Sequence, residues 1–267
     1  MFNNRKCALI GVVHVLPLPG SAGYDGDMQK IVRMAIEDAS KYVENGIDAL
    51  ILENMHDTPY LKGFVEPETT AAMTVVAQAV KAVKNVPCGM QLLAGANIEA
   101  LGVAVAASLD FVRVEGFVYA HVGDEGIHES CAAKLIRRRA SLKAEHIKIF
   151  ADIKKKHSAH AITSDVSLAE TAHAAEFFKA DGVIVTGSST GIAPETEDVA
   201  TARRAVSTAV LVGSGVTAEN VGPFVEHSDA LIVGSSLKYD GKWNNHVDAA
   251  RVRKLVEATK GLQRCTH

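Results

Sequence analysis

Short apolar runs alternate with longer stretches of helical periodicity eight times along this chain of 267 residues. The runs are rich in Val, Ile, Leu and Ala and lack a regular polar–apolar alternation, as in strands that are buried on both faces. The expected strands are Cys7–Val13, Ala49–Leu52, Cys88–Leu93, Phe111–Val114, Lys148–Ile153, Gly182–Val185, Val210–Val212 and Ala230–Val233. The expected helices that follow them are Asp27–Glu44, Glu68–Lys84, Asn97–Ala107, Glu129–Lys143, Leu168–Lys179, Thr196–Ser207, Ala218–Glu226 and His246–Lys260.

This alternation predicts parallel strands joined by right-handed crossovers. Eight strand–helix units within 267 residues predict an α/β fold, a (β/α)8 TIM barrel that occupies residues 1–267 as a single domain. The alternative is an open doubly wound sheet. Such a sheet normally carries a G-x-G-x-x-G turn after its first strand, and this chain has none.

Composition narrows the class of partner and the compartment. With 28 basic and 31 acidic residues the net charge is -3, which argues against nucleic acid or an anionic membrane as the main partner. The 4 cysteines are scattered and form no C-x-x-C pair, which is typical of a reducing compartment. No apolar run reaches the roughly 18 residues of a membrane span. We expect a cytoplasmic protein, with mitochondrial or other organellar targeting as the alternative.

Two glycine-rich turns follow the seventh and eighth expected strands. They read VGSGVTAEN and VGSSLK and contain Gly213, Gly215, Gly234 and Ser235. Many barrels hold phosphate at these two loops, where glycines let backbone N–H groups approach an anion. A helix expected to open near Ala218 would add its positive end. The turns therefore predict a phosphate site, although glycines that only shape tight turns are the alternative.

The sixth strand ends in a third small, hydroxyl-rich loop, TGSSTG. Its residues Thr186, Gly187 and Ser188 could complete the phosphate cradle or cover the substrate, and a flexible loop is the equal alternative.

Charged and amide side chains end the first two strands. His14 could act as a general acid or base, as a metal ligand, or only structurally. Glu53 could orient a substrate hydroxyl, act as a base or hold a cation, and an ion pair with Arg113 across the barrel is as well supported. Asn54 and Asp57 lie at the start of a long loop on the same face, and long loops there tend to be functional.

The fourth and fifth strands bring further charges. Arg113 and Glu115 share one face of their strand, which suggests an inward ion pair between them and makes Glu115 a candidate acid or base. Asp152 is the best single candidate in the next motif, ADIKKKHS, with Lys156 beside it for Schiff-base or proton-transfer chemistry.

The remaining residues of ADIKKKHS add weaker expectations. His157 is a candidate substrate contact, whereas Lys154 and Lys155 fit a solvated run. His157 and His160 have no recognised zinc spacing, so we expect no metal or other cofactor, and a divalent cation is the less favoured alternative. The residues at the opposite strand ends fit ordinary solvated positions; they are Lys6, Asp48, Asp110, Lys148 and Asp181.

Seven motifs spread over nearly the whole chain resemble the BtpA/SgcQ family. They are GVVHVLPLPG, LENMHDTPY, FVRVEGFVYAHVGDEGIHES, ADIKKKH, VTGSSTG, GSGVTAENV and WNNHVDAARV. The resemblance implies a barrel of the ribulose-phosphate-binding type. It brings no defined reaction, and the family name comes from a cyanobacterial factor for photosystem I biogenesis.

Two functions follow as hypotheses. The first is an enzyme that acts on a small phosphorylated metabolite, a sugar or nucleoside phosphate, by isomerase, lyase or aldolase chemistry. The second is a non-catalytic assembly or regulatory factor that retains the barrel. Barrels of this kind often pair, so a homo-oligomer is also expected.

Overall fold

The computed structural model describes residues 7–83, 86–260 and 262. Within them, eight parallel strands close into a barrel in the order β1-β11-β10-β9-β7-β4-β3-β2. The barrel strands are β1 (Ala8–His14), β2 (Ala49–Glu53), β3 (Cys88–Gln91), β4 (Phe111–Val114), β7 (Lys148–Ile153), β9 (Gly182–Thr186), β10 (Ala209–Gly213) and β11 (Ala230–Val233). The predicted (β/α)8 barrel is confirmed, and each predicted barrel strand is present.

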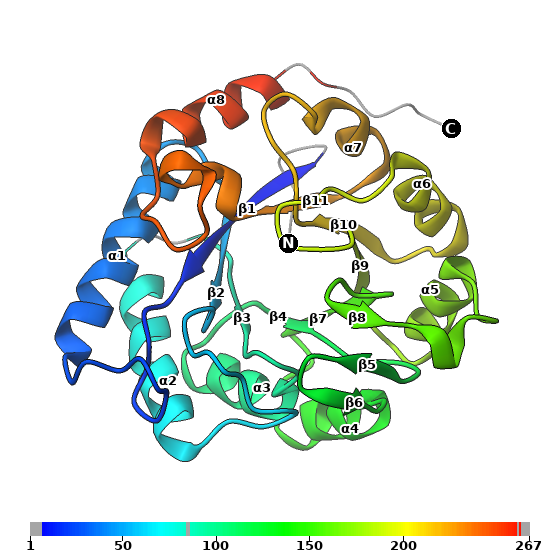
Figure 1. Cartoon of the computed structure of the whole chain (residues 1–267), viewed down its shortest axis with the longest axis horizontal. Coiled ribbons are helices and arrows are strands. Elements are labelled where there is room, and N and C mark those ends of the chain that lie inside the picture. The colour runs from blue at the N-terminus through cyan, green and yellow to red at the C-terminus, as the bar shows by residue number, and fades with distance from the viewer. Residues whose placement is uncertain (1–6, 84–85, 261, 263–267) are drawn as a thin grey trace.

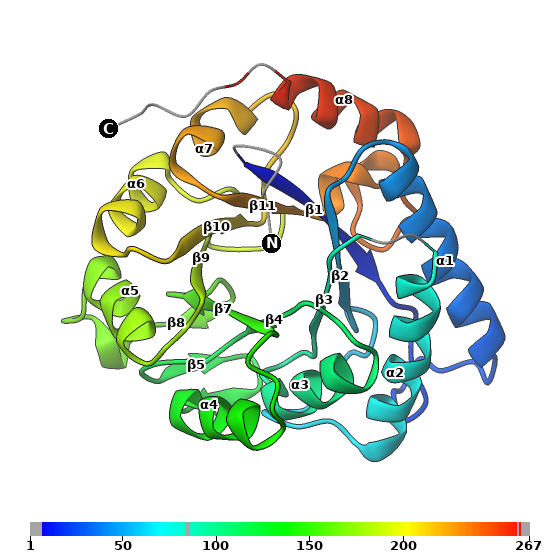
Figure 2. The ribbon, with the colours of Figure 1, turned by 180° about the vertical axis from the view of Figure 1, so that it is seen from behind.

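Helices surround the barrel as an outer ring (Figure 1), and the ring is equally plain from behind (Figure 2). They are α1 (Met28–Glu44), α2 (Pro67–Lys81), α3 (Asn97–Ala106), α4 (Ala132–Ser141), α5 (Leu168–Phe177), α6 (Thr196–Ala205), α7 (Val221–His227) and α8 (Ala249–Thr259). The side chain of Asp27 caps α1 by accepting from the Lys30 N–H, and Ser167 forms a capping box with Glu170 on α5. None of the described helices combines the length and the apolar character needed to cross a membrane.

A small antiparallel sheet that the sequence pattern does not predict lies beside the barrel mouth. It consists of β5 (His121–Gly123), β6 (Gly126–His128) and β8 (Ser158–Ala159), in the order β6-β5-β8. The hairpin β5–β6 follows β4, and β8 follows β7, so the sheet joins two neighbouring loops over the carboxyl ends of the strands (Figure 1). It forms one wall of the mouth.

Apolar side chains fill both faces of the barrel sheet. The layer between strands and helices forms the larger core, and a second cluster that includes Ile10, Phe111 and Phe150 fills the barrel interior. Phe111 lies over Gly89, where any Cβ atom would overlap its ring. The barrel interior is therefore a packed core rather than a channel.

Four aspartates tie the strands together in pairs at the amino end of the barrel. Each stands just before a strand and accepts a hydrogen bond from a backbone N–H of the neighbouring strand, at 2.8–3.0 Å. The pairs are Asp48 with Leu9, Asp110 with Cys88, Asp181 with Ile149 and Asp229 with Val210. The expectation that Asp48, Asp110 and Asp181 are ordinary solvated residues is wrong, because each closes part of the barrel. Lys6 lies outside the described residues.

Candidate active site

A buried arginine lies at the centre of the barrel mouth. Arg113, at the end of β4, donates to both carboxylate oxygens of Asp152 on β7, with Nε–Oδ1 and Nη2–Oδ2 distances of 3.1 Å. Its Nη1 atom lies 3.3 Å from Oε1 of Glu53 on β2. All three side chains are buried. The ion pair between Glu53 and Arg113, one of the alternatives that the sequence suggests for Glu53, is thus present. Asp152 contacts the same guanidinium.

Glu115 belongs to a separate buried pair. Its Oε2 atom lies 3.1 Å from Nζ of Lys155, and its Oε1 accepts from Nε2 of Gln91 at 3.1 Å. The expected ion pair between Arg113 and Glu115 is therefore replaced by three others: Arg113 pairs with Glu53 and Asp152, and Glu115 pairs with Lys155. The expectation that Lys155 is solvated is wrong, because its side chain is only 9% exposed. The charge that draws Lys155 inward comes from another strand, so the KKK run alone could not reveal it.

Burial shifts the pKa values of the groups around Arg113. Burial raises the pKa of Glu53, and Arg113 partly opposes this effect. The same two causes act in the same order on Asp152, whose pKa is also raised. Burial, together with the nearby Arg113, lowers the pKa of Lys156. Such shifts bring carboxyl and amine groups closer to the range in which they exchange protons at neutral pH.

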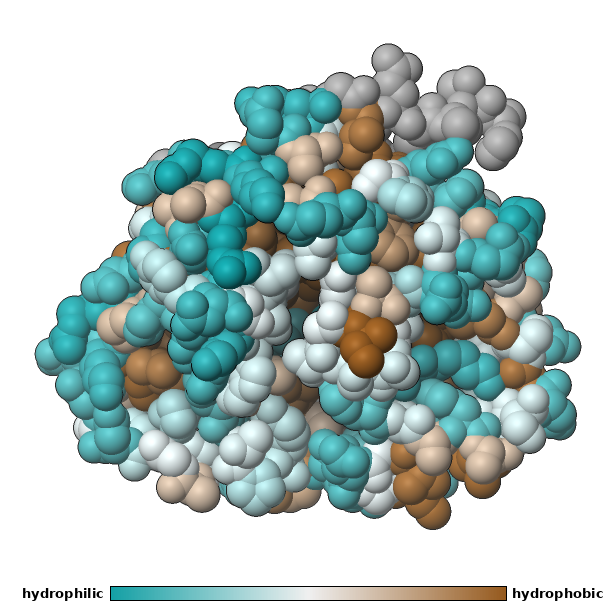
Figure 3. Space-filling view, turned by 45° about the horizontal axis from the view of Figure 1, so that its top comes forward, coloured by the Kyte–Doolittle hydropathy of each residue, from teal (hydrophilic) through white to brown (hydrophobic). Residues whose placement is uncertain are grey.

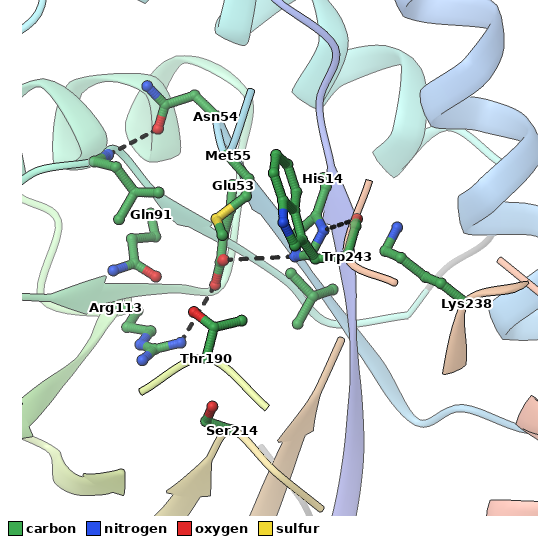
Figure 4. Close-up of polar contacts among 12 residues, drawn as sticks. His14, Glu53, Asn54, Met55, Gln91, Arg113, Thr190, Ser214, Lys238 and Trp243 are labelled. Carbon is green, nitrogen blue, oxygen red and sulfur yellow. Dashed lines mark hydrogen bonds and ion pairs between the residues drawn. The ribbon is translucent and has the colours of Figure 1, made fainter. Parts of the chain in front are cut away.

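His14, at the end of β1, is held as a neutral imidazole. Burial, and secondarily the charge of Lys238, lowers its pKa well below 6.5. Its Nδ1 atom lies 2.8 Å from the backbone oxygen of Trp243, which can only accept, so Nδ1 carries the proton. Nε2 is left with a free lone pair 4.0 Å from Oε2 of Glu53 (Figure 4). His14 thus presents a basic nitrogen beside a carboxyl group.

Trp243, which is not among the predicted site residues, reaches the mouth on the segment between β11 and α8. Lys238 anchors this segment at one end, with Nζ 3.7 Å from Oδ2 of Asp38 on α1. The other end is anchored by the Val247 N–H, which donates to Oδ1 of the same aspartate at 3.0 Å. The Trp243 ring lies 4.8 Å from the ring of His56, centroid to centroid. The sequence holds no signal for this anchoring, because the burial of Lys238 is visible only in the structure.

A cavity of about 300 Å³ opens between β10, β11 and the charged side chains. We call its glycine-rich side, formed by Ser214, Gly215, Gly234, Ser235 and Ser236, the glycine lobe. Nζ of Lys156 reaches this side and donates to Oγ of Ser214 at 3.2 Å. The lobe therefore combines small residues from both predicted phosphate turns with a desolvated amine.

The glycine lobe differs in detail from the expectation. The helix that was expected near Ala218 begins at Val221, because the Asn220 side chain accepts from the Thr217 N–H and donates to the Gly215 carbonyl. The Ser236 hydroxyl donates to the Val216 carbonyl, so it is engaged within the protein. A short 3-10 turn, η2 (Ser235–Leu237), begins in the lobe, and the first N–H groups of such a turn lack partners within it.

A second cavity of about 280 Å³ continues from the first. We call it the charged lobe, and Gln91, Glu115, Asp152, Lys155 and Trp243 line it. Both cavities share the five lining residues Glu53, Met55, Arg113, Lys156 and Thr190. They are accordingly two ends of one mouth, which Figure 3 shows as a hollow near the middle of a largely hydrophilic face.

Several predicted site residues shape the mouth without lining either lobe. Oγ1 of Thr186 accepts from the Lys156 N–H, and the Ser188 carbonyl accepts from the His157 N–H. A Cβ atom on Gly187 would lie 2.1 Å from the Ile192 oxygen, so only glycine fits there. Gly213 leaves room for Arg113, whose Nη2 lies 3.4 Å from the position of a Cβ atom.

Asn54 and Asp57 tie together the loops after β1, β2 and β3. Asp57 accepts from the Leu18 N–H and from the Asn54 amide, and Asn54 accepts from the Leu93 N–H. Both residues line a separate cavity of about 190 Å³. His157 lines the charged lobe and bonds to Thr190, which holds the 187–193 loop beside the mouth. Among the described residues, no three His, Cys, Asp or Glu side chains lie close enough together to hold a metal ion.

Solved structures of low sequence identity share this fold. Orotidine 5'-phosphate decarboxylase from Pyrococcus horikoshii matches with a TM-score of 0.60 at 14% identity, over 95% of this chain and 99% of that chain. Phosphoribosyl anthranilate isomerase from Thermus thermophilus matches with a TM-score of 0.59 at 14% identity, over 96% and 100%. These similarities show the barrel fold.

Relatives of higher identity cover nearly the whole chain. An uncharacterized mitochondrial protein of Caenorhabditis elegans is 43% identical over 99% of this chain and 97% of its own length. The photosystem I biogenesis protein BtpA of Synechocystis is 34% identical over 96% of this chain and 89% of its own. The BtpA family model matches residues 5–261. The chain therefore belongs to the BtpA family.

Proposed function

We propose that this protein is an enzyme that acts on a small phosphorylated metabolite by proton transfer at the barrel mouth. One observation carries the proposal: the glycine lobe and the buried ion-pair network meet at Glu53, Arg113 and Lys156 in a single mouth. A substrate whose phosphate occupied the glycine lobe would place its carbon skeleton against titratable groups.

The glycine lobe suits a phosphate dianion. Residues without large side chains let an anion approach the backbone, where N–H dipoles and the Lys156 amine stabilise it. The exposed Arg251 also lines this cavity and adds a second cation at its edge. The orotidine 5'-phosphate and phosphoribosyl barrels named above act on phosphorylated molecules, which supports the same use of the mouth here.

Glu53, His14 and Lys156 are the proposed proton-transfer groups. Glu53 has a raised pKa and lies beside the free Nε2 atom of His14, so the two can exchange a proton through a substrate group placed between them. Lys156 binds the anion in its protonated form, and because burial lowers its pKa it releases a proton more easily than a surface lysine and can act as a general acid. Asp152 holds the Arg113 guanidinium in place through its bidentate contact. Arg113 is then positioned to stabilise an oxyanion that forms on the substrate.

A thermal-shift experiment tests phosphate recognition. At 100 times its dissociation constant, a ligand adds about 2.7 kcal/mol, which raises the melting temperature by about 5 °C in a protein of this size. We expect this rise with inorganic phosphate or phosphate esters and its loss in Ser235→Asp, where a carboxylate would repel the anion. Ser141→Asp, on an exposed turn of α4, is the matched control. Equal shifts in both variants would contradict the proposal.

The alternative is a non-catalytic biogenesis or regulatory factor. It is favoured by the name of the Synechocystis relative, a photosystem I biogenesis protein that is 34% identical to this chain. The two hypotheses differ in whether the function needs the charged groups of the mouth. If the protein is an enzyme, a strain that carries Glu53→Gln should lose its function. If the protein is an assembly factor that acts through its outer surface, the same strain should keep it.

The compartment is part of the proposal. We place the protein in the cytoplasm, and the mitochondrial name of the Caenorhabditis elegans relative makes mitochondria the alternative. Fractionation of cells that express the tagged full chain distinguishes the two.

A further inference from the structure

Gln91 holds a buried hydrogen-bond acceptor that no described residue satisfies. Its side chain ends β3 and is 2% exposed, and Nε2 donates to Oε1 of Glu115. Because a carboxylate only accepts, this bond fixes which end of the amide is oxygen. Oε1 of Gln91 has no hydrogen-bond partner within the described part of the chain. Figure 4 shows this oxygen on the side of the amide that faces Glu53.

Buried acceptors are normally paired, so an unpaired one at a cavity wall indicates a ligand group that donates to it. Gln91 lines the charged lobe next to Arg113 and Glu115. Each carboxylate oxygen of Glu115 already has a partner, Gln91 for Oε1 and Lys155 for Oε2. Gln91 Oε1 differs in having no partner among the described residues, which makes it the candidate acceptor for a ligand hydroxyl group.

Gln91 lies on the opposite side of the mouth from the glycine lobe. In the circular strand order, three strands separate β3 from β10 on either side, so Gln91 lies across the barrel from Ser214 and Gly215. A single ligand that contacts both must therefore cross the mouth from one lobe to the other.

The charges at the two ends differ in sign. The hairpin between β5 and β6 brings Asp124 and Glu125 to the rim of the charged lobe, whereas Arg251 lines the cavity of the glycine lobe and Lys156 lies between the two. A second phosphate at the Gln91 end would meet this acidic rim. The ligand is accordingly anionic at one end and a neutral hydrogen-bond donor at the other.

We propose that Gln91 is a specificity-determining residue that binds a hydroxyl group of a sugar monophosphate, whose phosphate lies in the glycine lobe. The inference rests on the proposed function, because it takes the phosphate position from it. It adds the substrate class and the residue that selects it.

Two ligands that differ in one hydroxyl test this inference on the unaltered protein. D-xylulose 5-phosphate carries a terminal hydroxyl, and 1-deoxy-D-xylulose 5-phosphate lacks it. We expect isothermal titration calorimetry to give at least a tenfold lower Kd for the first, or about 1.4 kcal/mol. In Gln91→Met, which keeps the length and removes the acceptor, the two Kd values should become equal through weaker binding of D-xylulose 5-phosphate.

Inorganic phosphate and a matched variant complete the experiment. Gln91→Met should leave the Kd of inorganic phosphate within twofold, and Gln78→Met, on the exposed face of α2, should change none of the three Kd values. Equal affinity of the full-length chain for the two sugar phosphates, alongside binding of inorganic phosphate, would overturn the role of Gln91 and leave the proposed function standing. Failure of every phosphate compound to bind would overturn both.

Discussion

The imidazole of His14 bonds to the backbone carbonyl of Trp243, at an Nδ1–O distance of 2.8 Å, although 229 residues separate them in the chain. This contact joins the end of the first barrel strand to the segment after the last one. It fixes the tautomer of the histidine and holds the indole over the mouth at the same time. Any change at His14 should therefore be visible at Trp243.

The chain contains one tryptophan, so its fluorescence reports this contact directly. We expect His14→Ala to free the segment around Trp243 and to increase quenching by acrylamide, with a larger Stern–Volmer constant than in the unaltered protein. His173→Ala, on the exposed surface of α5, should leave quenching unchanged. A Stern–Volmer constant that stays the same in both variants would show that the contact does not hold the segment.

Removal of the central guanidinium should be strongly destabilising. Arg113→Met leaves Glu53 and Asp152 buried without their partner, and such losses cost about 3–5 kcal/mol. Arg204→Met breaks the exposed pair with Glu197 and should cost less than about 1 kcal/mol. Urea unfolding followed by circular dichroism measures both. Similar free energies of unfolding for the two variants would argue against a buried network.

Lys156 should react with amine reagents faster than surface lysines. Burial lowers its pKa, so at about pH 8 a larger share of its side chain is the neutral, nucleophilic amine. Trinitrobenzenesulfonate labelling followed by peptide mass spectrometry should find Lys156 modified before Lys254, whose side chain is 69% exposed. Inorganic phosphate should slow labelling of Lys156 alone. Preferential labelling of Lys254 would contradict the prediction.

Stability should fall as the solution becomes acidic below about pH 6.5. Burial lowers the pKa of His56 and of His121 from 6.5 to about 4, and that of His14 in the same direction. As pH falls, these histidines take up protons near pH 6.5 in the unfolded chain but only near pH 4 in the folded chain. Their contribution to the free energy of unfolding is therefore complete above pH 6.5 and is lost as pH falls toward 4.

A variant isolates one of these histidines. His121→Phe should show a smaller drop in melting temperature between neutral pH and pH 5 than the unaltered chain, whereas substitution of the exposed His146 by Gln should behave like the unaltered chain. The measurement is thermal unfolding by circular dichroism across that interval. An identical pH profile for His121→Phe would remove this residue from the explanation.

Gly215 should not tolerate a side chain. It has a φ of +69°, and a Cβ atom there would lie 2.0 Å from the Ala193 nitrogen, so Gly215→Ala must displace the 187–193 loop. We expect a lower melting temperature and weaker phosphate binding. Gly222→Ala, on α7 with open space around its Cβ position, should be neutral or raise the melting temperature slightly. A Gly215→Ala protein with unchanged phosphate affinity would contradict the model of the glycine lobe.

The barrel could be predicted from the sequence because each strand is a local apolar run and each crossover is a local helix. The small sheet could not be predicted, since β5 and β8 are only three and two residues long and pair across more than thirty residues. Nothing in the apolar pattern of Val122 or Ala159 marks such a partner. Its position over the mouth depends on the barrel having already formed.

The site was predictable only in part for the same reason. Residues at strand ends, such as Glu53 and Arg113, converge because the fold brings all eight ends together. Lys155 and Trp243 reach the mouth through contacts with Glu115 and His14, which come from distant parts of the chain. The sequence shows which groups are available, but their pairing depends on three-dimensional contacts.

The four aspartates at the amino end of the barrel carry a consequence for redesign of this molecule. Their hydrogen bonds join neighbouring strands at the amino end of the barrel and are made to backbone N–H groups of that end. Loops on the opposite rim could accordingly be exchanged or grafted while the scaffold stays closed. Natural divergence of these loops would be tolerated on the same physical grounds.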